Sequence, residues 1–113
     1  MLTVENLKEL GVNTDEGLAR CMNNEQFYLM LVGKALSDDG IERLDSALRS
    51  GNLDEGFETA HSLKGVLGNL SLTPLYDAVA EITELLRART QIDYTPYMEK
   101  ITSLWKELKN LCD

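Results

Sequence analysis

The sequence predicts an all-α protein, built as an antiparallel four-helix bundle with additional short helices at its N-terminus. Apolar residues recur every three or four positions over most of the 113 residues, which is the spacing of one helix face. No segment shows the strict alternation of apolar and polar residues that is typical of a half-buried strand. The pairs Thr73-Pro74 and Thr95-Pro96 are typical helix starts, because proline is favoured in the first helical turn. Together these patterns favour amphipathic helices joined by short connections, which pack as a bundle.

The first part of the chain predicts short helices followed by longer ones. Residues 4–10 form one or two turns that stop at Gly11, and residues 14 to about 22 form a second short helix. A longer helix is expected after Asn24, and another over residues 41–48 that ends at Ser50-Gly51. The bundle proper therefore begins near residue 24 or residue 38.

Three long helices are expected to complete the bundle. Asn52 begins the first, with Asp54 and Glu55 in the turn where the helix dipole favours carboxylates. Thr73 and Thr95 are expected to cap the other two, each with proline in the first helical position. The predicted buried faces are Leu53, Phe57, Ala60, Leu63, Leu67 and Leu70; Leu75, Val79, Ile82 and Leu86; and Tyr97, Met98, Ile101, Leu104, Trp105, Leu108 and Leu111.

Composition and charge narrow the class of protein. Residues 1–113 are expected to form one domain, since no Ser-rich or Pro-rich linker and no repeat divides them. The formal net charge of -8 argues against binding to nucleic acid, which needs clustered basic residues. Neither a secretory signal nor an apolar run long enough to span a membrane is visible, so we expect a cytoplasmic protein, and a monomer. Cys21 and Cys112 are expected to be reduced thiols, without the partners a metal site needs.

The only histidine lies on the helix expected after Asn52, in the stretch AHSLKGVLGNLS over residues 60–71. At about 100° per residue, with His61 set to zero, the leucines and alanine of the buried face centre near about 240°. His61 therefore lies about 120° from the core direction, at the border of the exposed face. Gly65 and Gly68 fall within about 40° of His61, and Lys64 lies at about -60°.

The two glycines beside His61 predict a steric purpose. Each destabilises a helix interior by roughly 1 kcal/mol relative to alanine. Close packing of another helix of the bundle would explain them only on the core side, and the angles place them away from it. We therefore expect that Gly65 and Gly68 clear the helix surface around His61 for an approaching partner.

His61 and Lys64 favour one kind of chemistry. Neutral imidazole is a nucleophile near neutral pH and can carry a phosphoryl group on nitrogen. A lysine one turn away supplies a point charge for the phosphoryl oxygens. No serine, cysteine or carboxylate arrangement completes a triad with His61, and no second metal ligand accompanies it.

The residues Ala60-His61-Ser62-Leu63-Lys64-Gly65, followed by Gly68-Asn69-Leu70, resemble the motif of histidine-containing phosphotransfer domains, the HPt family of multi-step phosphorelays in two-component systems. The resemblance extends over the whole chain, including the N-terminal run LGVNTDEGLARCMNNEQFYLMLV. It implies a helical bundle in which an exposed histidine exchanges a phosphoryl group with aspartates of receiver domains. Such a chain is a phosphoprotein carrier and not an enzyme with its own ATP-binding kinase domain.

Site roles follow from the resemblance position by position. His61 would accept the phosphoryl group, Lys64 would neutralise it, and Gly65 would leave room for the partner, with Gly68 at a position that is often small. Ser71 departs from a family glycine and Val66 from a small residue, which bears on partner specificity. The implied partners are response-regulator receiver domains and a hybrid histidine kinase. Any Mg²⁺ would belong to the receiver, so the chain needs no cofactor or metal of its own.

Further contacts to the partner are expected at Phe57, Glu58 and Arg87. Glu58 could orient the imidazole by accepting its second N–H, although an exposed glutamate on a solvated face is the simpler interpretation. Arg87 and Arg89 could contact an acidic receiver rim, or could serve only as cations at a helix C-terminus.

Two other functions remain open on sequence alone. A helical docking module would bind a signalling protein through the same face without phosphotransfer. A hydrolase with His61 as general base would need a nucleophile and an oxyanion donor, and the sequence identifies neither. A complete sensor kinase is not expected, because no nucleotide-binding motif is present in these residues.

Overall fold

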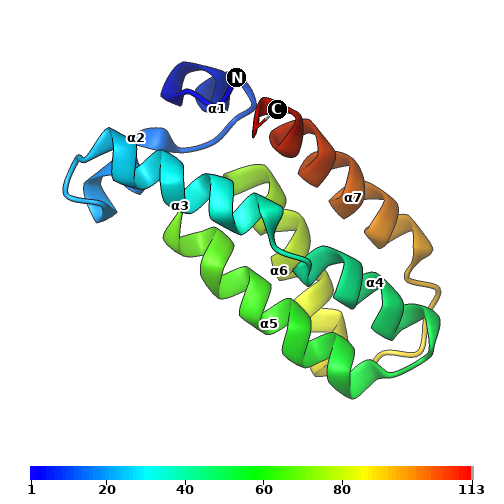
Figure 1. The fold of residues 1–113 in the computed structure, drawn as a ribbon. Helices are drawn as coiled ribbons and strands as arrows, with labels where there is room; N and C mark the ends of the chain where they lie inside the picture. Colours follow the sequence, from blue (N-terminus) through cyan, green and yellow to red (C-terminus); the bar gives the residue numbers. More distant parts are fainter. Residues whose placement is uncertain (113) are drawn as a thin grey trace.

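The protein folds into four helical arms, each made of one long helix or of two helices end to end, which run alternately up and down its long axis (Figure 1). The molecule extends 41 × 24 × 19 Å along its three principal axes. The structure is a computed structural model that describes residues 1–112. Within them it contains seven α-helices, one short 3-10 helix and no strand. The predicted all-α class and four-helix bundle are therefore confirmed. Asp113, the last residue of the predicted domain, lies outside the described residues.

The elements follow the chain in a simple order. The short helices α1 (Val4–Glu9) and α2 (Thr14–Arg20) lie at the end of the bundle where both termini are found (Figure 1). The arms are α3 (Glu25–Ser37) with α4 (Gly40–Arg49), then α5 (Leu53–Asn69), α6 (Thr73–Arg87) and α7 (Thr95–Lys109). The 3-10 helix η1 (Asn110–Cys112) ends the described chain. No helix of residues 1–112 has the length and apolar character needed to cross a membrane.

The first arm consists of two helices, α3 and α4, with a break at Asp38. This break explains why the sequence predicts a start of the bundle near residue 24 or near residue 38. Asp38 takes an extended conformation (φ -70°, ψ 154°) and ends α3. Its carboxylate then accepts a hydrogen bond from the Gly40 amide at 2.9 Å, at the start of α4. The helices α3 and α4 consequently lie end to end along one side of the bundle (Figure 1).

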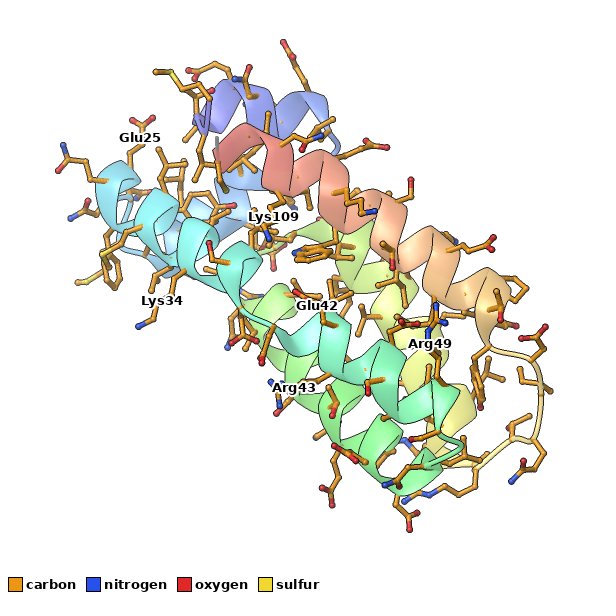
Figure 2. The ribbon with its side chains drawn as sticks, turned by 45° about the vertical axis from the view of Figure 1, so that its right-hand side comes forward. Glu25, Lys34, Glu42, Arg43, Arg49 and Lys109 are labelled. Carbon is orange, nitrogen blue, oxygen red and sulfur yellow. The ribbon has the colours of Figure 1, made fainter. Side chains whose placement is uncertain are left out.

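The core is formed largely by the apolar faces that the sequence predicts, but some predicted members are only partly buried: Leu53, Phe57, Leu63, Tyr97, Leu104 and Leu111. All four residues of the predicted α6 face, Leu75, Val79, Ile82 and Leu86, are 0% exposed. Trp105 joins α7 to α3, because its indole N–H donates to the Leu36 carbonyl at 2.9 Å. Lys109 covers the same ring with its ammonium 4.6 Å from the ring centroid, and Figure 2 shows it on the side of α7 that faces α3. Cys21 is a buried thiol outside any disulfide.

Helix starts are confirmed at the asparagines and corrected at the threonines. The Asn52 side chain accepts the Glu55 amide at 3.1 Å and caps α5. The helices α6 and α7 begin at Thr73 and Thr95 themselves, so the prediction that these threonines are the caps is wrong by one residue. The Thr73 hydroxyl instead donates to the Ser71 carbonyl at 3.0 Å, because the turn before α6 places that carbonyl beside it.

Ser71 occupies the one position of the α5–α6 connection that favours glycine. It has φ +55°, in the left-handed region. Its amide donates to the Gly68 carbonyl and the Leu72 amide donates to the Leu67 carbonyl, which is the Schellman end of a helix. The family glycine expected here thus has a physical reason, and serine adopts the same turn at a conformational cost.

Candidate functional site

His61 is exposed on α5, as the helical angles predict. Phe57 lies one turn before it, and Gly65 and Gly68 lie one and two turns after it. These four positions form a stripe along the outer side of α5, away from the buried Ala60 and Leu67. The helix therefore presents the imidazole to solvent with an aromatic ring on one side and bare backbone on the other.

A groove of about 480 Å³ opens beside His61. Its wall on α5 includes His61, Lys64 and Gly65, and α6 contributes Tyr76. The short helix α2 closes the far side with Arg20. Three elements that are distant in sequence thus surround a space that begins at the imidazole.

The two glycines play different parts in this groove. A Cβ atom built on Gly65 meets no heavy atom within 4 Å, so this position is open as the sequence predicts. A Cβ atom built on Gly68 would lie 3.0 Å from the Tyr76 ring, which is closer than ordinary van der Waals contact. The expectation that no helix of the bundle packs against Gly68 is wrong, because Tyr76 of α6 fills the space that its missing side chain leaves.

Lys64 is half-buried beside His61 and faces a carboxylate that the sequence analysis did not identify. Its ammonium lies 4.0 Å from a carboxylate oxygen of Glu84 on α6. Arg87 also bonds Glu84, with its Nε 3.2 Å from the carboxylate. The Arg87 hydrogen bond is the main reason that the pKa of Glu84 lies below its ordinary value, and the charges of Arg87, Lys64 and His61 add to it. Glu84 is therefore an anion held close to the histidine and its lysine.

Phe57 connects His61 to the cations at the end of α6. Its ring stacks on the imidazole, with 5.6 Å between the ring centroids and 24° between the planes. The guanidinium carbons of Arg87 and Arg89 lie 5.0 and 4.9 Å from the Phe57 centroid. Arg89 also bonds Asp54 at 2.7 Å and donates to the Leu86 carbonyl, so the second of its two expected roles, a cation at a helix C-terminus, is confirmed. Its contact with a receiver stays a prediction.

The remaining predicted contact residue, Glu58, is exposed. Its side chain forms no hydrogen bond or ion pair with His61 or any other group among the described residues. The ring of Phe57 is the group that contacts the imidazole in its place. Val66, one residue beyond Gly65, is 46% exposed and adds an apolar side chain to this surface of α5.

In residues 1–112 no group of three or more histidine, cysteine or acidic side chains is arranged to hold a metal ion. The groups that the site presents are one exposed imidazole, one half-buried ammonium and open backbone. Such a site can present a nucleophilic nitrogen to a group carried by another macromolecule.

A helical bundle with an exposed histidine on its second long arm, followed by lysine and glycine one turn later, defines a class of carrier proteins. Comparison with protein families matches the Hpt domain model over residues 34–113. The chain belongs to this family, whose members are phosphocarriers of two-component phosphorelays and not kinases. Comparisons with curated proteins and with solved structures give no match.

Sequence reasoning missed the residues that reach the site from other elements. Glu84 and Tyr76 come from α6 and Arg20 from α2. Arg20 also lies outside the matched residues 34–113. The one available signal was the pair Glu84 and Arg87, spaced three apart at the end of a helix, which is the spacing of a side-chain pair on one face.

Proposed function

We propose that this chain is a phosphorelay carrier in which His61 accepts a phosphoryl group and exchanges it with an aspartate of a receiver domain. The observation that carries the proposal is the exposed imidazole on α5 beside the open backbone of Gly65. Membership of the Hpt family supports the same function. A carrier must expose its histidine to a second protein, and it does not need a closed catalytic pocket.

The transfer step requires the imidazole nitrogen, the phosphorus and the aspartyl oxygen to lie in line, with the nitrogen attacking and the oxygen leaving. The lone pair of an imidazole nitrogen forms the N–P bond while the P–O bond of the aspartyl phosphate breaks, and its electron pair stays on the aspartate carboxylate. The reverse step regenerates the acyl phosphate. Catalysis of such transfers rests on positioning and charge stabilisation. Gly65 supports the positioning, because no side chain stands in the partner's path one turn from His61.

Lys64 would stabilise the phosphoryl oxygens. Its side chain is 29% exposed and its ammonium is 4.0 Å from Glu84, so a weak ion pair holds it before phosphorylation. A phosphoryl group on His61 carries more negative charge than the carboxylate and would compete for the same ammonium. Lys64 would then exchange Glu84 for the phosphoryl oxygens.

The partners follow from the chemistry that the site does not supply. We place Mg²⁺ in the acidic pocket of the receiver, where it would neutralise the aspartyl phosphate. A histidine kinase, free or as a hybrid with a receiver, would supply the phosphoryl group from ATP. The carrier's own residues would bind the receiver and present the imidazole.

The test is transfer of label from a phosphorylated receiver domain. The purified protein is incubated with a panel of ³²P-labelled receivers and Mg²⁺, and the product is treated with acid and with alkali. We expect label on the wild-type protein that survives alkali and is lost in acid, as a phosphorus–nitrogen bond requires, and none on His61→Gln. Receivers that bind the wild-type protein without transferring label would overturn the proposal and identify a docking module.

A further inference from the structure

The three N-terminal helices are anchored on the short connection between α5 and α6. The Asn13 amide donates to the Ser71 carbonyl at 3.1 Å, and the buried Tyr28 hydroxyl donates to the Leu70 carbonyl at 2.9 Å. Arg20 adds a third anchor, since its Nη1 donates to the Gly68 carbonyl at 2.8 Å. The segment that precedes the family match at residue 34 is therefore fastened directly beside the phosphotransfer helix.

Arg20 places a cation at the end of the groove that begins at His61. Its Nη2 bonds Glu16 at 2.6 Å, and both side chains are about half exposed, at 47% and 48%. The two bonds to Gly68 and Glu16 leave further N–H groups of the guanidinium, which has five. The arginine is thus oriented by the protein and still able to bind a ligand.

A second residue that lines the groove, Ser71, has a side-chain hydroxyl without a hydrogen-bond partner among the described residues. The Ser71 hydroxyl is buried, with the residue 7% exposed, and among the described residues no atom hydrogen-bonds it. Ser71 lines the groove together with Arg20. Because the Ser71 hydroxyl oxygen is closed off from solvent, a ligand in the groove can reach the half-exposed Arg20 guanidinium and not this hydroxyl.

The cations around His61, and not the net charge of the chain, indicate the charge of the group that would bind Arg20. The formal net charge is -8, which repels an acidic partner at a distance. Cations nevertheless lie on both sides of His61, with Lys64 and Arg20 along the groove and Arg87 beside Phe57. The groove also contains two carboxylates, those of Glu16, which pairs with Arg20, and Asp77. The guanidinium of Arg20 already binds one carboxylate, that of Glu16, through Nη2 alone, and carboxylates are the groups that its planar fork matches best.

We propose that Arg20 is a specificity-determining residue that binds an acidic side chain on the rim of the receiver domain docked at His61. This inference rests on the proposed function. In the complex, a carboxylate of the receiver enters the groove and shares or replaces Glu16 at the guanidinium. The N-terminal segment thereby selects among receivers that the family motif alone would not distinguish.

The experiment measures the initial rate of label transfer against the concentration of the phosphorylated receiver that labels His61. Arg20→Gln is expected to raise the half-saturating receiver concentration roughly three- to tenfold, with the maximal rate changed less than about twofold. Arg20→Lys should fall between the two, since it keeps the charge and loses the fork. The difference between Arg20→Gln and wild type should shrink at high salt, as an ion pair between proteins requires.

Arg49→Gln is the matched control. Arg49 forms the same kind of ion pair, with Asp45 four residues earlier at 2.8 Å, so the substitution changes the net charge equally. It lines a second groove with α7 residues such as Met98, away from His61, and is labelled on α4 in Figure 2. We expect its half-saturating concentration to match that of the wild type.

The outcomes distinguish a failure of the proposed function from a failure of the inference about Arg20. If wild type receives no label, the proposed function fails. If wild type is labelled and Arg20→Gln has the same half-saturating concentration, Arg20 does not bind the receiver and only the present inference is overturned. The same holds if Arg20→Gln and Arg49→Gln weaken transfer equally, because net charge alone would then explain both. Thermal unfolding of each variant shows whether a loss of transfer reflects a loss of folded protein.

Discussion

The ring of Phe57 stacks on the imidazole of His61 with 5.6 Å between their centroids and only 24° between their planes. Because Arg87 and Arg89 both lie over Phe57, the stacked pair is joined to the end of α6. We expect the aromatic ring to limit rotation of an imidazole that is otherwise exposed. We therefore expect Phe57 to position the imidazole that is proposed to accept the phosphoryl group.

Replacing Phe57 with leucine tests this role. Phe57→Leu keeps an apolar side chain but loses the flat surface, so we expect transfer to His61 to slow roughly two- to tenfold, as the energies of aromatic pairs suggest. Since His61 is the only histidine, its ring resonances in NMR spectra report the change directly. Phe57→Tyr retains the ring and should behave as wild type. Wild-type rates and unchanged resonances in the leucine variant would contradict the stacking role.

Alanine at the two glycines should have opposite consequences. Gly65→Ala is expected to raise the free energy of unfolding by about 0.5 to 1 kcal/mol, because its Cβ enters open space in a helix interior. Gly68→Ala should lack this gain or lose stability, since its Cβ would lie 3.0 Å from the Tyr76 ring. Urea unfolding of both variants measures the difference.

A larger side chain at Gly65 separates folding from partner access. Gly65→Gln should fold at least as stably as wild type, because the position is open. It should also slow label transfer from a receiver, because the side chain would stand in the partner's path. A variant that transfers at the wild-type rate would show that the bare backbone of Gly65 serves no docking purpose.

Removing the charge of Glu84 should favour the phosphorylated carrier. Glu84→Gln releases Lys64 from its partner at 4.0 Å and removes an anion close to His61. We expect the equilibrium ratio of phosphohistidine to aspartyl phosphate to rise, as measured by the distribution of label between carrier and receiver. Glu107→Gln on the exposed side of α7 makes the same charge change elsewhere and should leave the ratio unaltered. A fall in the ratio for Glu84→Gln would mean that Glu84 assists His61 and does not compete for Lys64.

The raised pKa of the buried Tyr28 hydroxyl predicts that the folded protein loses stability at alkaline pH. Burial, with a smaller contribution from Cys21, raises its pKa from 10.0 to about 12. The unfolded chain therefore loses the phenolic proton first as pH rises. The stabilisation is complete below about pH 10 and disappears toward pH 12, with a magnitude on the order of 2 kcal/mol.

The check is urea unfolding between pH 9 and pH 12, compared for wild type and Tyr28→Phe. The variant should be less stable near neutral pH by about 1 kcal/mol, since the Leu70 carbonyl loses its donor. Its stability should then fall less steeply above about pH 10, because the group that titrates has been removed. Parallel pH profiles for the two proteins would assign the alkaline loss to other groups.

Much of the fold could be predicted because helices carry their pattern locally. The spacing of Leu75, Val79, Ile82 and Leu86 requires only that one helix face meet a core, and all four are fully buried. The exposure of His61 could be predicted for the same reason, since its angle is measured against leucines of its own helix. The spacing does not locate the division of the first arm at Asp38, because a short break leaves the apolar pattern on both sides intact.

The sequence by itself thus determined the helices, most of their buried faces and the motif of His61, Lys64 and Gly65. Only the tertiary structure decided what surrounds that motif. Tyr76 fills the space at Gly68, Glu84 faces Lys64, and Arg20 reaches a carbonyl 48 residues away in the chain. Such contacts depend on how separate helices pack against one another, and the periodicity of a single helix holds no information about which side chain of a neighbour will face it.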